Sequence, residues 1–281
     1  MAVNRASRGM FLLFWLAGGL LIAFILLPLL QMAASQTPAR LGRVIAMPDV
    51  RAAILLSLEA AFMTAALAGL LGVPLAYLLA RLEFPGKSVV EAMVDVPLAI
   101  PHTVVGIALL FVFGRNGLIG GVVNRLTGFR FWGTAGGIVV AMLFVSAPYA
   151  VNAARVGFES VNVRLEKVAR TLGVGPWGVF TQVTLPLAGR GIMTGLTLTF
   201  ARSISEFGAV IVLSYFPMTA PVKIYDLFIQ FGLNDSSAMA VVFLTVTLVL
   251  FILFRSLVRG RRRPHGRRWS PGRPTSLGHG Q

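Results

Sequence analysis

The sequence contains no cysteine, few acidic residues and few charges of any kind. Across 281 residues there are 10 Asp and Glu against 25 Lys and Arg, and charged residues make up 12% of the chain. The absence of cysteine excludes disulfide bonds, a thiolate nucleophile and cysteine-ligated metal sites. The three histidines, His102, His265 and His279, are too scattered along the chain to predict a shared metal site.

Hydrophobic residues, by contrast, make up 56% of the chain, and the mean hydropathy is +0.81. This composition leaves too little polar surface to solvate a globular domain, so it predicts a membrane protein. A net charge of +15 is also found in nucleic-acid-binding proteins, but here the basic residues lie mostly between and after long apolar runs. The expected partner is therefore the lipid membrane and not nucleic acid.

Six apolar runs predict six transmembrane helices and an all-α, polytopic fold. The first run, Met10 to Leu30, has twenty-one residues without a charge and would extend about 30 Å as a helix. An even number of spans places both termini on one side, which the arginines in 259–263 predict to be cytoplasmic. We expect a membrane domain over 1–258 and a disordered, basic cytoplasmic tail over 259–281. The expected spans cover residues 10–31, 52–80, 89–113, 132–152, 187–213 and 237–258.

A polar segment between the fourth and fifth spans, residues 152–186, is longer than a helix connection requires. An apolar stripe spaced i, i+3, i+4, i+7 within it predicts a short amphipathic helix. Gly173 follows the stripe, where glycine can end a helix, and Pro186 suits the first turn of the fifth span. The partner of the stripe is either the protein's own helices or another subunit. The stripe consists of Leu165, Val168, Ala169 and Leu172, and the other faces carry Glu166, Lys167 and Arg170.

Ionisable residues inside a span indicate a transport path, because each costs about 2.5–3.5 kcal/mol at mid-bilayer unless a partner or water is present. In the fifth span Arg202 and Glu206 are spaced i, i+4 and share one helical face with Ser205, and Ser203 lies to the side. One interpretation is an ion pair that joins helices of the bundle. The other is a polar pore for an anion, lined by Arg202 and the serine hydroxyls, in which Glu206 prevents overly tight binding.

Two prolines, Pro97 and Pro101, interrupt the start of the third span just before His102 and Thr103. Each proline removes a helical N–H, and broken backbone at membrane depth is tolerated only where protein or water satisfies it. The segment is predicted to be either a gate or a simple kinked start of the helix. His102 is expected to be packed and hydrogen-bonded rather than a proton carrier.

Other patterns predict no catalytic residues. Gly86-Lys87-Ser88 resembles the end of a phosphate-binding loop, but Arg81 stands where that loop requires a glycine. Arg81 is therefore interpreted as a topology charge, one of the positive charges that orient the chain in the membrane. Neither Gly-x-Ser-x-Gly nor His-x-x-x-His occurs in the spans, so no enzyme and no bound cofactor is expected. Two glycine pairs predict close helix packing, Gly191-x-x-x-Gly195 and Gly133-x-x-x-Gly137.

The segment Glu166-Lys-Val-Ala-Arg-Thr-Leu-Gly173, followed by Val183 and by Leu185-Pro186, resembles the EAA loop of ABC-importer permeases. Lys167 stands where that family usually has Glu, Val168 and Val183 replace Ala and Ile, and Glu166 is one position early. The resemblance implies a type I permease fold in which this loop is a coupling helix seated on a separate ATPase subunit. ATP and magnesium would then bind to that subunit.

Two further stretches, Asp95-Val-Pro-Leu-Ala-Ile-Pro-His-Thr-Val-Val-Gly106 and Ala201-Arg-Ser-Ile-Ser-Glu-Phe-Gly-Ala209, resemble the molybdate and tungstate permeases. The resemblance covers roughly residues 50–255 and implies a homodimer in a prokaryotic inner membrane, with two ATPase subunits and an external oxyanion-binding protein. That protein would dock on 114–131 and 214–237. A permease for sulfate or another small anion is the alternative, whereas an ATP-independent secondary transporter would need coupling-ion acids and repeats that the sequence does not show.

Overall fold

The computed structural model describes residues 5–259, with side chains described over 9–253. This part of the chain is helical and contains no strand, which confirms the predicted all-α fold. The predicted tail, 259–281, lies outside the described residues apart from Arg259. In chain order the helices are α1 (Arg5–Ala34), α2 (Pro38–Ala46), α3 (Pro48–Arg81), α4 (Lys87–Ala99), α5 (His102–Phe113), α6 (Gly120–Thr127), α7 (Ala135–Glu159), α8 (Val163–Thr171), α9 (Pro176–Val179), the π-helix η1 (Phe180–Thr184), α10 (Leu185–Ile204), α11 (Gly208–Leu213), α12 (Ala220–Phe231) and α13 (Leu233–Arg259).

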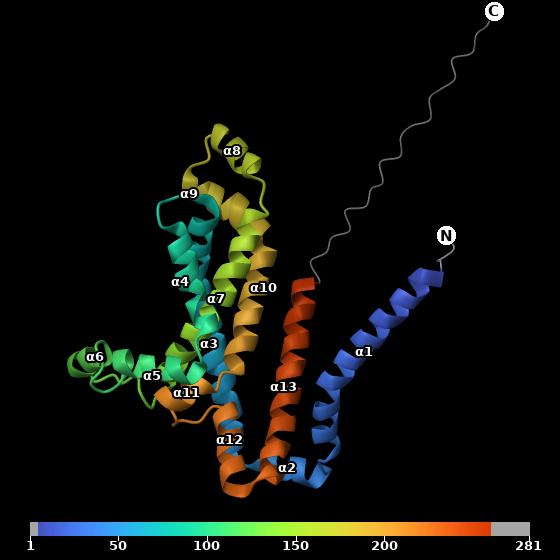
Figure 1. Cartoon of the computed structure of the whole chain (residues 1–281). Helices are drawn as coiled ribbons and strands as arrows, with labels where there is room; N and C mark the ends of the chain where they lie inside the picture. The colour runs from blue at the N-terminus through green and yellow to red at the C-terminus, as the bar shows by residue number, and fades with distance from the viewer. Residues whose placement is uncertain (1–4, 260–281) are drawn as a thin grey trace, which may run out of the picture.

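The centre of the fold is a bundle of three long helices, α3, α7 and α10, which stand side by side in Figure 1. Helix α3 contributes to all three apolar clusters, through Ala61, Ala60 and Ala76 respectively. Its buried face is a ladder of mostly small residues, while large side chains such as Phe62 and Leu70 are exposed. Small residues on the packed face let helix backbones approach closely, and large apolar residues on the outer face suit contact with lipid.

Helices α7 and α10 meet backbone to backbone at glycine. A Cβ added to Gly191 would lie 2.5 Å from the Cα of Gly157, and one added to Gly195 would lie 3.0 Å from the carbonyl oxygen of Ala150. Close packing at Gly191 and Gly195 is therefore confirmed. The prediction for Gly133 is wrong, because Gly133 lies before α7 with a φ of +65° and is not part of a helix.

The third predicted span is not one straight helix. Helices α4 and α5 are bent by 114° at the short break between them. The break falls at Ile100 and Pro101, because a residue before proline is pushed out of the helical region and Ile100 has φ −89° and ψ 135°. Pro97 lies within α4 and is buried, so it does not cause the break.

The fifth predicted span, 187–213, is also divided. Helix α10 continues directly from η1, begins at Leu185 and ends at Ile204, and α11 begins only at Gly208. The backbone turns at Glu206, whose Oε1 accepts a hydrogen bond from the N–H of Ala209 at 2.9 Å in the first turn of α11. The apolar run therefore forms two helices rather than one.

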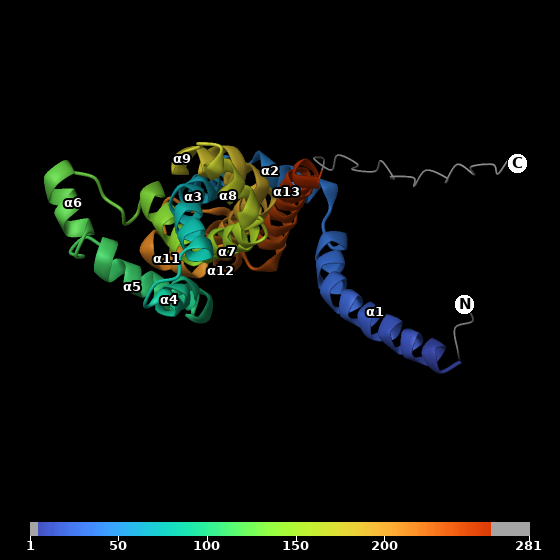
Figure 2. The same cartoon turned by 90° about the horizontal axis from the view of Figure 1, so that it is seen from above.

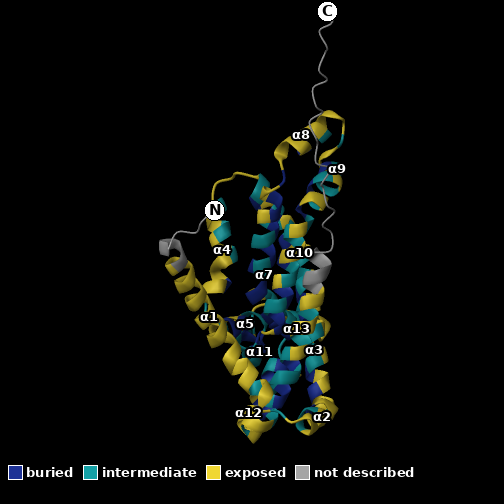
Figure 3. Cartoon of the chain, turned by 90° about the vertical axis from the view of Figure 1, so that its right-hand side faces the viewer, coloured by how far each residue is buried: buried dark blue, intermediate teal, exposed yellow. Residues whose placement is uncertain are grey.

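The two ends of the bundle carry different elements. Helix α8 lies at one end, and α2 and α12 lie at the opposite end; α1 begins and α13 ends toward the α8 end (Figure 1). Helix α1 stands away from the other helices (Figure 2), and all of its residues from 9 to 34 except Met32 are exposed (Figure 3).

Four of the described helices are long and apolar enough to cross a membrane: α1, α3, α7 and α13. Helices α4 and α5, bent against each other, are together also long and apolar enough to cross a membrane and would make a fifth span. Helix α10 has 20 residues, about 30 Å at 1.5 Å per residue, but it carries Arg190 and Arg202 and is not among them. The count of six spans stays a prediction.

Candidate functional site

The predicted amphipathic helix in the 152–186 segment is α8. Asn162 caps its start by accepting a hydrogen bond from the N–H of Arg164. At its end Gly173 adopts a φ of +86°, and the N–H of Val174 reaches back to the carbonyl of Ala169 at 3.1 Å. This is the Schellman arrangement that a left-handed glycine permits, so the predicted glycine stop is confirmed.

The apolar stripe of α8 faces outward. Leu165 is 49% exposed, Val168 56% and Leu172 78%, while Ala169 is half-buried. Trp177, at the start of α9, is 76% exposed and extends the apolar surface. We call these side chains, together with the exposed Lys167 and Arg170, the α8 face. The helices that the structure describes leave this face open, which favours the second of the two predicted partners, another subunit.

Glu166 points the other way, into the protein, and is the one buried residue of α8. Its Oε1 accepts hydrogen bonds from Arg81 Nε and Nη2, at 3.0 and 2.8 Å, and from Thr184 Oγ1, at 3.0 Å. Arg81 is thus an ion-pair partner at the end of α3 and not merely a topology charge. Pro186 lies in the first turn of α10, as predicted.

A second polar cluster lies where both broken spans turn. Nη2 of Arg202, at the end of α10, lies 2.9 Å from Oε2 of Glu206. His102, at the start of α5, places Nδ1 2.8 Å from the same oxygen, and Arg202 Nη2 approaches both ring nitrogens at 2.8 and 2.9 Å. In one consistent arrangement, His102 Nδ1–H donates to Glu206 and Nε2 accepts from Arg202. We call these three residues the break cluster.

The break cluster is buried on one side and open on the other. The Glu206 side chain is 1% exposed, whereas those of Arg202 and His102 are 23% and 37% exposed. Arg202 therefore presents part of its guanidinium outward while Glu206 neutralises it from within. Gly208 packs so closely on His102 that an added Cβ would lie 2.8 Å from that of His102.

The remaining predicted gate residues differ in exposure. Ser203 is fully buried and donates a hydrogen bond to Ser146 Oγ of α7 at 2.9 Å, so it joins two helices. Ser205 is exposed beside Arg202, and Pro101 and Thr103 are exposed at the α4–α5 break. The structure thus brings Arg202, Glu206, Ser205 and the α4–α5 break together, and turns Ser203 away.

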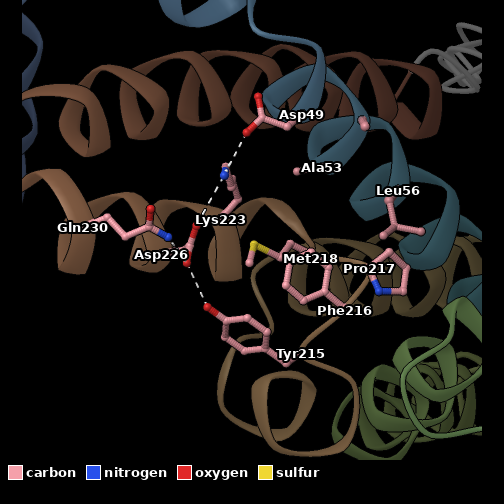
Figure 4. A pocket seen from close by; sticks show the side chains of 11 residues that line it. Asp49, Ala53, Leu56, Tyr215, Phe216, Pro217, Met218, Lys223, Asp226 and Gln230 are labelled. Carbon is pink, nitrogen blue, oxygen red and sulfur yellow. Dashed lines mark hydrogen bonds and ion pairs between the residues drawn. The ribbon is translucent and has the colours of Figure 1, made fainter.

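A cavity of about 670 Å³ lies between the start of α3, α12 and the segment that precedes α12 (Figure 4). Lys223 Nζ bridges Asp49 Oδ2 at 2.8 Å and Asp226 Oδ2 at 3.3 Å. Asp226 Oδ1 also accepts hydrogen bonds from Tyr215 and Gln230, at 2.9 and 2.7 Å. We call this the outer pocket, because it lies toward the end opposite α8.

Hydrogen bonding keeps the α12 side of the outer pocket ionised. Burial alone would raise the pKa of Asp226, but hydrogen bonds from Tyr215, Gln230 and Lys223 outweigh it and hold the pKa below its ordinary 3.8. Burial alone would lower the pKa of Lys223, but hydrogen bonds and charge attraction with Asp49 and Asp226 raise it above 10.5. The hydrogen bond to Asp226 likewise raises the pKa of Tyr215.

Sequence reasoning missed the outer pocket and the roles of Arg81 and Thr184. Lys223 and Asp226 are spaced i, i+3, a local signal that could have suggested an ion pair. No local signal links Arg81 to Glu166, because 85 residues separate them. No group of His, Asp and Glu suited to a metal occurs among the described residues.

The fold and these sites define a multi-pass membrane protein with an exposed amphipathic helix, α8, at one end and a polar cluster within its bundle. A family model for the inner membrane component of binding-protein-dependent transport systems matches residues 72–263. The chain therefore belongs to that family, the transmembrane components of such transporters.

Individual relatives agree with this assignment. The chain is 44% identical to the molybdate/tungstate transport system permease protein WtpB of Thermococcus kodakarensis, over 89% of this chain and 96% of that protein. It is 39% identical to the molybdenum transport system permease protein ModB of Escherichia coli K12, over 76% of this chain and 96% of that protein. A chain of a bacterial alginate ABC transporter in complex with its periplasmic protein superposes with a TM-score of 0.74 at 16% identity, over 90% of this chain and 96% of that chain. The predicted ABC-permease fold is confirmed.

Proposed function

We propose that this chain is the membrane-spanning permease subunit of an ATP-driven importer for a tetrahedral oxyanion, tungstate or molybdate. It works as a homodimer, with an ATPase subunit seated on each α8 face and an oxyanion-binding protein at the opposite end. Both chain termini then lie in the cytoplasm, because α1 begins and α13 ends toward the α8 end.

The observation that carries this proposal is the open α8 face. Leu165, Val168 and Leu172 are exposed on a helix whose inner side is anchored by Glu166. Exposed apolar patches rimmed by charge mark protein interaction sites. Lys167 and Arg170 supply positive charge beside the patch, so the complementary cleft on the ATPase is expected to be apolar with an acidic rim.

Helix α1 supports the homodimer. The most apolar 18 residues within Gly9–Ala34 include no residue that is buried in the protomer. Helix α1 also stands apart from the bundle in Figure 2. A span that packs weakly on its own bundle is available to lipid and to a second copy. The open sides of α4 and α5 are likewise available for that copy, and the pore then forms between the two protomers.

The break cluster suits the transit of an oxyanion. A guanidinium presents several N–H donors in a planar fork that matches oxyanion geometry. Because Glu206 and His102 already engage Arg202, the bare positive charge is reduced, and an anion is attracted without being trapped. We propose tungstate or molybdate rather than sulfate because the WtpB and ModB relatives, whose names specify these ions, are 44% and 39% identical to this chain, whereas a relative named as a sulfate permease is 30% identical.

Reconstitution with the companion ATPase and binding protein tests the proposal. The tagged chain should retain the ATPase subunit in mild detergent, and vesicles should accumulate tungstate or molybdate only with ATP. Leu172→Glu should release the ATPase subunit, whereas Leu126→Glu is the matched control, because the two leucines are 78% and 79% exposed. A chain that retains no ATPase subunit, or uptake driven by an ion gradient alone, would overturn the proposal; preferred uptake of sulfate would overturn the substrate.

A further inference from the structure

Helix α8 is held to the protein by charge rather than by apolar packing. Of its nine residues Glu166 is the one that is buried, and its side chain is 5% exposed. The neighbouring η1 is held differently, because Phe180 packs on Tyr77 of α3 with ring centroids 4.8 Å apart. Burial of apolar surface therefore fixes η1, whereas one carboxylate fixes α8.

That carboxylate joins three segments at one oxygen. Arg81 is the last residue of α3, and Thr184 is the last residue of η1, directly before α10. Both donate to Glu166 Oε1, and Arg81 Nη2 also donates to the carbonyl of Val161, ahead of α8, at 3.2 Å. Any displacement of α8 thus bears directly on the ends of α3 and α10.

We propose that Glu166, with Arg81 and Thr184, is the joint through which movement of α8 reaches the transmembrane bundle. The proposal rests on the proposed function, because it needs an ATPase subunit to move α8. Glu166 is a positioning residue that faces away from that subunit. The ATPase subunit displaces α8 by contact with the α8 face, and the Glu166 joint transmits this displacement to α3 and α10.

The two helices at the joint carry the other polar sites. Helix α3 extends without interruption from Arg81 to Asp49 in the outer pocket, and α10 extends from η1 to Arg202 in the break cluster. A helix of 34 residues is about 51 Å long at 1.5 Å per residue. The joint therefore connects the inner end of the protein to both sites at once.

Conversion of charge at the joint tests the proposal in the complete transporter. In vesicles, Glu166→Gln and Arg81→Gln should each raise the ATP hydrolysed per oxyanion imported at least tenfold while the ATPase subunit still co-purifies. The charge-swapped double variant, Arg81→Glu with Glu166→Arg, should recover part of the wild-type ratio. Glu83→Gln is the matched control, because this side chain is 88% exposed and pairs only locally with Lys87.

The outcomes separate this inference from the proposed function. If the wild-type chain retains no ATPase subunit, the proposed function fails. If the complexes assemble and both single variants keep the wild-type ratio, or the double variant is no better than the singles, the joint is overturned and the importer stands. If the charge variants do not assemble, Thr184→Val tests the joint instead, because it removes one hydrogen bond and keeps both charges. A two- to fivefold rise in the ATP hydrolysed per oxyanion imported supports the joint, and an unchanged ratio overturns it.

Discussion

Arg202 and Glu206 form an ion pair across the end of a helix, with 2.9 Å between Nη2 and Oε2 although α10 ends at Ile204. The pairing follows from the i, i+4 spacing, but Glu206 has already left the helix and caps α11. Its carboxylate therefore holds together the two halves of the divided fifth span, and it does so beside His102 from the divided third span.

Arg202→Ala should lower oxyanion uptake at least tenfold and also lower thermal stability. Glu206 is 1% exposed, and removing one partner of a buried ion pair costs about 3–5 kcal/mol because the other charge is left uncompensated. The double variant Arg202→Ala with Glu206→Gln should recover the unfolding midpoint in detergent without recovering uptake in vesicles. Normal uptake by the double variant would show that Arg202 serves only to pair with Glu206.

Gly173→Val should leave membrane insertion intact and uncouple uptake from ATP hydrolysis. Gly173 has a φ of +86°, and left-handed backbone costs a residue with a side chain about 1–2 kcal/mol. A Cβ there would meet no atom within 4 Å, so the effect comes from conformation and displaces the end of α8. The ratio of ATP hydrolysed to oxyanion imported measures it.

Gly175→Ala is the matched control for this prediction. Gly175 has a φ of −64° and an equally open Cβ position, so alanine fits without strain. Equal coupling in the two variants would contradict the importance of the glycine stop at Gly173.

Local rules predicted α8 well because its determinants lie within a few residues. The stripe, the stop at Gly173 and the placement of Pro186 in the first turn of α10 all depend on neighbours in sequence. The burial of Glu166 could not be predicted in the same way. A charged residue on a short amphipathic helix is assigned to water unless its partner is known, and Arg81 is 85 residues away.

The span boundaries show the same division between local and distant causes. The residues of 187–213 form one apolar run, so periodicity predicts one helix, yet α10 ends at Ile204, and Glu206 beyond it lies against His102. Pro101 did signal a break in 89–113, and the 114° bend lies there. Proline acts through its own backbone, whereas Glu206 at the other turn contacts His102, a residue 104 positions away that no local rule brings to it.

Gly191→Ala should destabilise the protein by about 1–3 kcal/mol or more, the cost of overpacking a close-packed site. The added Cβ would lie 2.5 Å from Gly157 Cα, and backbone cannot move aside as a flexible side chain can. The yield of monodisperse protein and the unfolding midpoint in detergent measure the effect.

Gly189→Ala provides the control on the same helix, because a Cβ there meets nothing within 4 Å. Alanine also favours a helix over glycine by about 1 kcal/mol, so this variant should be neutral or slightly stabilised. If both alanine variants behave alike, the backbone contact between α7 and α10 is less tight than described.

Asp226 should make the stability of the outer pocket depend on pH at the acidic end. Its pKa is lowered below 3.8 in the folded protein, so its ionised form stabilises the fold above the unfolded-state pKa. This contribution is lost as pH falls through the lowered pKa. The difference in unfolding midpoint between wild type and Asp226→Asn should therefore be constant near neutral pH and shrink below about pH 4. Lys223→Met removes the ammonium that pairs with Asp226 and should weaken the same pH dependence. If the midpoints of wild type and Asp226→Asn instead differ by a constant amount down to pH 3, the ion pair adds nothing to the stability of the outer pocket.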